Sequence, residues 1–340
     1  MEFRIVIDPH THIVPSGFLE DVRNKAFGDT VTVQNADGKE WIVTKSNVLG
    51  KSRELRNILT PMYYEVDLRL KDMKRMGVSR QILSVSPSLT FYSLDRSITQ
   101  DLAQSMNDAL IQITKDNPSH FSCMATVPLQ DPELAAEELE RAVKNGHLGV
   151  QIASNVAGQN LDDPELDVFW QKAQDLGITI FIHPIDTMGA ADRLKDFYLR
   201  NFIGNPLDTT IAAACLIFGG VLDRFPNLNF FLSHLGGFLP WIRGRWEHGY
   251  GERREPKVHG SKNTEEYINR FFYDTIIHNA DSFEFAVKTL GAERVLYGTD
   301  YPADMANHQN CREIPGMSRL EEKQQNQILI ENVRKLYQIT

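Results

Sequence analysis

Short apolar runs recur along the chain, separated by longer segments in which apolar residues repeat every three or four positions. Such runs are typical of buried strands, and the longer segments are typical of amphipathic helices. The runs predict eight strands, over residues 3–7, 81–85, 121–127, 149–152, 179–183, 229–234, 271–275 and 294–298. Helices are predicted at about 65–76, 97–117, 132–145, 164–176, 206–224, 238–248, 279–290 and 319–337. This alternation indicates an α/β fold with parallel strands and crossover helices.

Eight strands that are each followed by a helix favour a (β/α)8 TIM barrel. Residues 15–60 do not fit the alternation, because two β-rich runs flank the turn signal Asp37-Gly38 there. That pattern predicts a small β-hairpin within an insertion after the first strand. No internal repeat or Pro/Gly-rich linker divides the chain, so we expect residues 1–340 to form a single domain.

Polar residues that can carry chemistry follow the predicted strands. Barrel enzymes place their catalytic groups at the C-terminal ends of strands, where this chain has His10, His12, His183, His234 and Asp300. His10 and His12 alternate along an extended segment, so both side chains face the same side. With His183 and Asp300 they form a ligand set suited to Zn²⁺. His234 can either bind the same ion or act as an acid/base.

Five further histidines are interpreted as structural or solvent-facing, because they fall in loops or at strand starts: His120, His147, His259, His278 and His308.

Composition excludes several classes of partner. The net charge is −9, from 36 Lys and Arg against 45 Asp and Glu, so no basic field attracts nucleic acid or an anionic membrane. The three cysteines are far apart and show no CxxC spacing, which predicts a reducing compartment. The first residues become polar too early for a signal sequence, and no run of 18 apolar residues follows. We therefore expect a cytoplasmic protein that has no membrane partner.

Four motifs together resemble a known family. They are Asp-Pro-His-Thr-His at 8–12, His-Pro at 183–184, Ser-His-Leu-Gly-Gly at 233–237 and Gly-Thr-Asp-Tyr-Pro at 298–302. In this order they resemble the amidohydrolase superfamily, and more narrowly its metal-dependent decarboxylase branch. The resemblance runs from end to end and includes segments without obvious chemistry, such as 219–226 and 244–249.

The resemblance implies a metal-dependent, non-oxidative decarboxylase that acts on an aromatic or muconate-semialdehyde-type carboxylic acid. It implies that His10, His12, His183 and Asp300 bind one divalent ion, most often zinc, although another divalent metal such as manganese is compatible. His234 would be the catalytic acid/base, paired with Asp300.

Two arginines are implied to hold the substrate carboxylate. They are Arg253, which would reach the site of a neighbouring subunit in a homodimer, and Arg56 from the insertion.

Two alternatives stay open at this point. The same metal and His/Asp pair could hydrolyse a C–C, lactone or amide bond, because an activated water can attack a carbonyl. The chain could also be a metal-binding scaffold without activity, although the presence of His10, His12, His183, His234 and Asp300 disfavours that interpretation.

Overall fold

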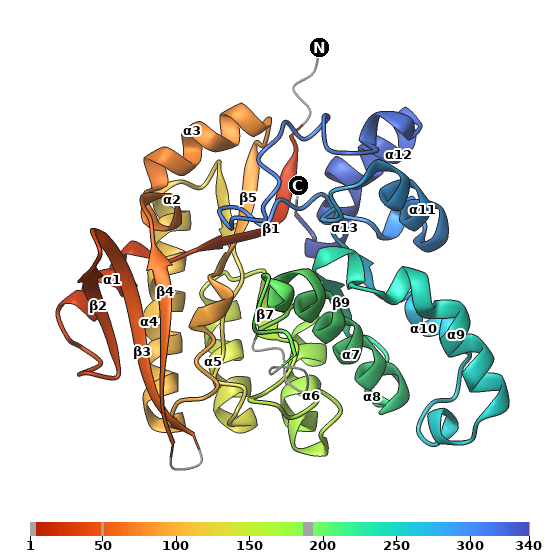
Figure 1. Cartoon of the computed structure of the whole chain (residues 1–340), viewed down its shortest axis with the longest axis horizontal. Helices are drawn as coiled ribbons and strands as arrows, with labels where there is room; N and C mark the ends of the chain where they lie inside the picture. Colours follow the sequence, from red (N-terminus) through yellow and green to blue (C-terminus); the bar gives the residue numbers. More distant parts are fainter. Residues whose placement is uncertain (1–4, 49–50, 186–192, 340) are drawn as a thin grey trace.

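The computed structural model describes residues 5–48, 51–185 and 193–339 of the chain, and it has an α/β fold (Figure 1). Its parallel strands form two groups with the orders β1-β5-β6 and β10-β9-β8-β7. Their bounds are Ile7–Ile13 (β1), Arg80–Val85 (β5), Phe121–Cys123 (β6), Gly149–Ala153 (β7), Thr179–His183 (β8), Asn229–Leu232 (β9) and Phe272–Tyr273 (β10).

Single parallel bridges lie between and beyond these groups. Ala125 pairs with Val150 of β7, and Tyr273 of β10 pairs with Val295. A third bridge joins Thr11 of β1 to Tyr301, and His12 donates its backbone N–H to the carbonyl of Tyr301 at 2.7 Å. Residues near the C-terminus therefore lie against the first strand.

The first strand differs from its predicted position. It was expected over 3–7, but β1 begins at Ile7 and ends at Ile13, because these residues pair with β5. The pairing register shifts between Asp8 and Thr11, as at a β-bulge, which bends a strand and re-aims its side chains. Residues 3–4 lie outside the described part of the chain.

The prediction of a regular eighth strand over 294–298 is wrong. A 3₁₀ turn occupies Ala292–Arg294, and only Val295 forms a bridge. The backbone N–H groups that follow donate to different elements: that of Leu296 bonds to Tyr273, and that of Tyr297 bonds to Ile328. A ladder requires one continuous partner strand, which this segment does not have.

Helices occupy each of the predicted helical regions within the described residues. The main ones are α3 (Val66–Met76), α4 (Arg96–Asp116), α5 (Pro132–Lys144), α6 (Asp167–Leu176), α7 (Asn205–Phe218), α9 (Leu239–Glu252) and α11 (Ala280–Leu290). The prediction over 206–224 was wrong in one respect, because the helix stops at Gly219–Gly220 before the short α8 (Val221–Arg224). Gly220 has φ +77°, a left-handed conformation that glycine adopts without strain.

The last predicted helix, 319–337, is divided into three parts. They are α12 (Glu322–Asn326), a π-helical turn (Gln327–Glu331) and α13 (Asn332–Tyr337).

Residues 16–48 and 51–59 form a small unit on one side of the molecule (Figure 1). Helix α1 (Ser16–Arg23) is followed by β2 (Val31–Ala36) and β3 (Lys39–Val48), which pair in antiparallel register around Asp37-Gly38. A third strand, β4 (Lys51–Leu59), pairs with β3, and neither it nor α1 was predicted.

Two further short α-helices are α2 (Pro61–Tyr64) and α10 (Thr264–Ile268). In the described ranges, none of the helices is both long and apolar enough to cross a bilayer.

Candidate metal centre

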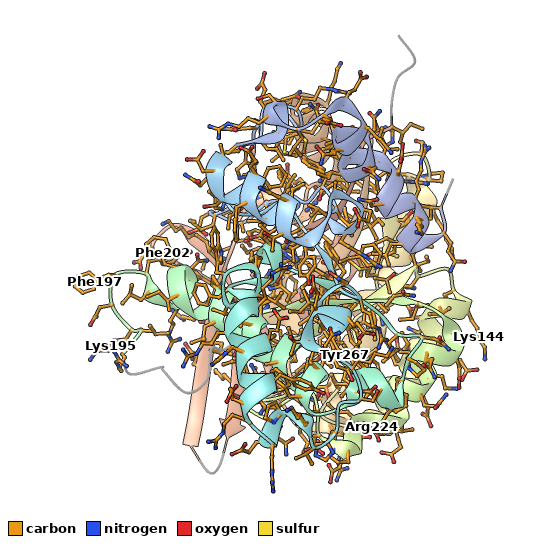
Figure 2. All side chains as sticks on the ribbon, turned by 90° about the vertical axis from the view of Figure 1, so that its right-hand side faces the viewer. Lys144, Lys195, Phe197, Phe202, Arg224 and Tyr267 are labelled. Carbon is orange, nitrogen blue, oxygen red and sulfur yellow. The ribbon has the colours of Figure 1, made fainter. Side chains whose placement is uncertain are left out.

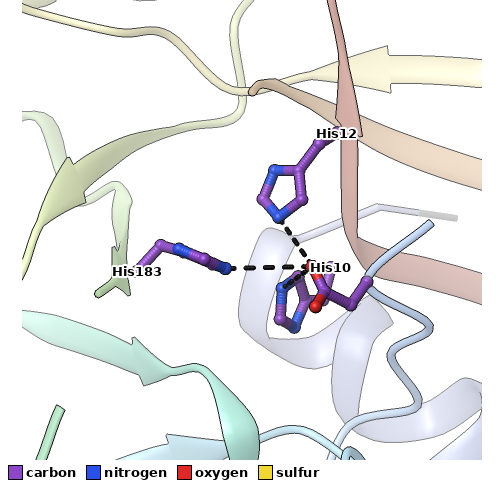
Figure 3. Close-up of side chains that lie close together, drawn as sticks. His10, His12 and His183 are labelled. Carbon is purple, nitrogen blue, oxygen red and sulfur yellow. Dashed lines mark ion pairs between the residues drawn. The ribbon is translucent and has the colours of Figure 1, made fainter. Parts of the chain in front are cut away.

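Four buried side chains bring one potential ligand atom each into a small space. They are His10 and His12 from β1, His183 from the end of β8, and Asp300, and their ligand atoms lie within 4.8 Å of one another. The Oδ1 atom of Asp300 lies 3.2 Å from Nε2 of His10, 3.1 Å from Nε2 of His12 and 3.8 Å from Nε2 of His183. Figure 3 shows the imidazoles of His10 and His12, both from β1, and that of His183 from β8 converging on one carboxylate.

In each of the three histidines, the other ring nitrogen, Nδ1, already has a hydrogen-bond partner. Nδ1 of His10 lies 2.6 Å from Oδ2 of Asp274, and Nδ1 of His183 lies 2.9 Å from the carbonyl of Pro184. Nδ1 of His12 lies 3.1 Å from Oγ of Ser84. The three Nε2 atoms are buried and have no hydrogen-bond partner among the described residues.

Buried polar atoms that lack a partner are costly, and here three of them converge on one carboxylate. Three imidazole nitrogens and one carboxylate oxygen are ligands that zinc and manganese accept. The residues present therefore fit a divalent ion.

The electrostatics of the four groups are coupled. Burial lowers the pKa of His10, but Asp300 and Asp274 outweigh it and raise that pKa to about 10. Burial also lowers the pKa of His12, and it lowers that of His183 well below the usual range. Burial opposes ionisation of Asp300, yet His10 and the neighbouring imidazoles hold the pKa of this carboxyl well below its usual value. Both shifts favour a pair of imidazolium and carboxylate, His10 with Asp300, when no metal is bound.

His234 lies beside this group and faces the other oxygen of the same carboxylate. Its Nε2 atom is 3.5 Å from Oδ2 of Asp300, and its Nδ1 atom is buried without a hydrogen-bond partner in the described chain. His234 begins the 3₁₀ turn that follows β9, and both His234 and Leu235 have left-handed φ values of 52° and 53°. Strained backbone of this kind is concentrated at functional sites.

A cavity of about 290 Å³ opens beside His234 and Asp300. Apolar side chains make up much of its wall, and Asn201, Asn205 and His278 add polar groups. Its apolar and aromatic side chains include Phe202, Phe238, Trp241, Ile276 and Met305. Figure 2 shows Phe202 near the molecular edge, with Phe197 further out. A concave apolar cavity with a few convergent polar groups is the usual form of a small-molecule site.

His278 was interpreted as structural or solvent-facing, and it is indeed exposed, but it also lines the cavity beside His234. The available signal in the sequence was that His278 comes shortly after the predicted strand 271–275, on the side where barrel enzymes place their sites.

The two arginines expected to bind substrate lie elsewhere in this single chain. Arg253 is exposed, pairs with Glu255 and lines a separate cavity of about 340 Å³ together with Trp246. Arg56 belongs to β4 and lies 3.0 Å from a carboxylate oxygen of Glu54. Neither arginine is among the described residues that line the cavity beside His234.

Sequence reasoning missed two residues that support the centre. Asp274 is fully buried and holds the ring of His10. Arg69 of α3 is also buried, and it donates to Oγ1 of Thr11 at 2.7 Å and to the carbonyl of His12. Asp274 could have been found as a carboxylate near the C-terminal end of the predicted strand 271–275. Arg69 gives no such signal, since an arginine on an amphipathic helix is usually solvated.

Comparison with known proteins agrees with this geometry. The amidohydrolase family profile matches residues 7–339. The chain belongs to the amidohydrolase family. A 2-amino-3-carboxymuconate-6-semialdehyde decarboxylase from Dictyostelium discoideum is 34% identical over 298 residues, which cover 87% of this amidohydrolase and 81% of the relative. This likeness places the chain in the metal-dependent decarboxylase branch.

Solved structures share the fold of this amidohydrolase. The 5-carboxyvanillate decarboxylase from Sphingomonas paucimobilis superposes with a TM-score of 0.80 at 22% identity and covers 99% of both chains. A dihydroxybenzoic acid decarboxylase from Polaromonas sp. JS666, solved with bound manganese and the inhibitor 2-nitroresorcinol, has a TM-score of 0.79 at 22% identity. The match covers 98% of this chain and 97% of that one.

Proposed function

We propose that this amidohydrolase is a metal-dependent, non-oxidative decarboxylase whose substrate is an aromatic or muconate-semialdehyde-type carboxylic acid. The observation that carries the proposal is the convergence of three buried Nε2 atoms on Asp300 beside an aromatic-lined cavity. The Dictyostelium relative is named as a decarboxylase of a muconate semialdehyde, which supports the same substrate class.

His10, His12, His183 and Asp300 would hold the divalent ion, with zinc or manganese as the expected metal. When bound, such an ion supplies Lewis acidity that draws electron density from the reacting acid. Decarboxylation breaks the bond between the carboxylate carbon and the ring or chain carbon, and the bonding electrons stay on the latter. His234 delivers a proton from Nε2 to that carbon as CO₂ leaves.

Asp300 links the two roles, because Oδ1 faces the metal-binding imidazoles while Oδ2 lies 3.5 Å from Nε2 of His234. The carboxylate thereby orients the proton-transfer group relative to the ion. The apolar walls formed by Phe238, Trp241 and Ile276 would hold a planar substrate and exclude water.

We also propose that a second subunit completes the site. The substrate class carries a carboxylate, and none of the described residues that line the cavity is lysine or arginine. Arg253 is exposed, and the ion pair it forms among the described residues is with its near neighbour Glu255, so it is available to a partner chain. In a homodimer Arg253 of one subunit, together with Arg56 of the insertion, would orient the substrate carboxylate bidentately.

The proposed framework is a single-domain (β/α)8 barrel over residues 1–340 with an insertion at about 15–60. The parallel bridges Ala125–Val150, Tyr273–Val295 and Thr11–Tyr301 support closure of the two strand groups into one barrel. Cytoplasmic localisation remains a prediction from composition.

The test compares two reactions under controlled metal content. Protein freed of metal with a chelator, then restored with Zn²⁺ or Mn²⁺, is assayed on hydroxylated aromatic acids and muconate-type acids for CO₂ release. Lactones and amides of similar size are assayed in parallel for hydrolysis. We expect metal-dependent CO₂ release. Hydrolysis without CO₂ release, or full activity after metal removal, would refute the proposal.

A further inference from the structure

Asp274 occupies an unusual position between the metal centre and the proposed acid/base. It directly follows β10 and is fully buried. Its Oδ2 atom lies 2.6 Å from Nδ1 of His10 and accepts the backbone N–H of His234 at 2.7 Å. Its Oδ1 atom accepts the backbone N–H groups of Leu235 at 2.7 Å and Ile276 at 2.9 Å.

We propose that Asp274 is a positioning residue that sets the proton location on the His10 ring and the place of His234 at the same time. This inference rests on the proposed function, because it assigns His10 to the ion and His234 to proton transfer. A single carboxylate oxygen contacts both elements, so movement of either one is transmitted to the other.

The first step of the argument concerns the His10 ring. A carboxylate accepts but does not donate, so the hydrogen bond to Asp274 places a proton on Nδ1 of His10. Once Nε2 of His10 has lost its proton to make way for an ion, its lone pair faces Oδ1 of Asp300, where that ion would bind. Carboxylate partners of this kind orient metal-binding histidines and strengthen them as ligands.

The second step concerns the turn that carries His234. Two consecutive residues without glycine's freedom, His234 and Leu235, have left-handed φ values. Such a conformation persists only where surrounding contacts enforce it. The two oxygens of Asp274 accept both of their N–H groups, and these bonds hold the imidazole of His234 beside Oδ2 of Asp300.

The third step is that only an acceptor satisfies all four partners. Three of them are backbone N–H groups, and the fourth is the His10 Nδ1–H. Asparagine in place of Asp274 would turn an NH₂ group toward one donor pair, whichever way its amide is oriented. Asparagine therefore keeps the shape of the Asp274 side chain. It removes the acceptor either for the pair His10 and His234 or for the pair Leu235 and Ile276.

The experiment measures metal affinity as well as turnover in Asp274→Asn. The matched control is Asp223→Asn, because Asp223 also accepts a backbone N–H, from Ser261, and belongs neither to the four proposed ligands nor to the described residues that line the cavity. Competition with a chelator for Zn²⁺ should show a 10- to 100-fold loss of affinity in Asp274→Asn, and less than a twofold change in the control. At saturating Zn²⁺ the kcat for CO₂ release should remain at least tenfold lower in Asp274→Asn.

A folded Asp274→Asn variant with unchanged zinc affinity would overturn the proposal, even if its thermal stability fell. A second measurement does not depend on the variant folding. Nitrogen-15 NMR of histidine-labelled, zinc-loaded wild-type protein should show the His10 ring protonated at Nδ1, and a proton absent from Nδ1 would also overturn it.

These readouts separate the inference from the proposed function. Loss of zinc affinity in the Asp274 variant, combined with no CO₂ release by the wild type, supports the role of Asp274 toward His10 and refutes decarboxylation. Normal decarboxylation with unchanged zinc affinity in the variant refutes only the role of Asp274.

Discussion

Substitution of Gly298 by alanine tests whether the metal centre depends on close backbone packing. A Cβ atom at Gly298 would lie 2.9 Å from Cβ of His10 and 3.0 Å from Cβ of Asp274. Both neighbours are attached directly to backbone, so neither can swing away as the end of a flexible side chain can. Gly298 has no left-handed φ, and the perturbation is therefore purely steric.

The size of the effect follows from these distances. Contacts of this kind require the neighbours to retreat by about 0.5 Å, and such overpacking of a core costs about 1–3 kcal/mol. We expect Gly298→Ala to lower the free energy of unfolding of the metal-free protein by that amount. Because His10 is one of the displaced groups, zinc affinity should fall about tenfold or more.

The matched control is Gly244→Ala in α9, where an added Cβ meets nothing within 4 Å. This substitution should stabilise the protein by about 0.5–1 kcal/mol, since alanine favours a helix over glycine. Denaturant titration gives the unfolding free energies, and chelator competition gives the zinc affinities. Wild-type stability and wild-type zinc affinity in Gly298→Ala would refute the steric reasoning.

Three further predictions concern the proposed roles. His234→Ala should retain metal but lose about 10²–10⁴-fold in turnover, whereas Asp300→Ala should lose metal as measured by elemental analysis; unchanged turnover in the His234 variant would contradict its role. The pKa of His10 is raised to about 10. At any pH below 10, a metal that binds His10 must therefore displace a proton from its ring. The apparent zinc affinity should then rise about tenfold per pH unit between pH 7 and 9. Calorimetry of zinc binding in buffers of different ionisation enthalpy measures how many protons are released per ion. Release of no proton would contradict the coupling of His10 to Asp300 and Asp274. Arg253→Ala should lose activity that is partly restored in mixed oligomers with His234→Ala, if each subunit completes the site of the other.

Local signals predicted many of the elements correctly. Asp131 and Asp163 each stand directly before a proline, and each accepts a backbone N–H at the start of a helical segment. Gly177 ends α6 in a left-handed conformation with φ 63°. These features depend on residues within a few positions of each other, so the sequence contains the information needed to predict them.

Predictions failed where distant contacts decide the backbone path. The segment 294–298 has the apolar composition of a strand, but its N–H groups bond to two different elements. Strand β4 contains the charged stretch Arg53-Glu54 and Arg56, a pattern that does not suggest a strand. It is paired along one side with β3, and such edge strands tolerate charged residues.

The residue types at the strand ends are known from the sequence alone, so the meeting of His10, His12, His183 and Asp300 could be predicted from it. Side chains alternate along a strand, and parallel strands present their C-terminal ends at the same edge. Both rules apply to any sequence in which the strands can be recognised. Only the tertiary structure decided that Asp274 holds the His10 ring from 264 residues away, that Asp300 divides its oxygens between the imidazoles and His234, and that Arg253 lies apart from the cavity. Those contacts depend on three-dimensional packing, in which distances of a few ångströms decide which atoms can share a proton or an ion.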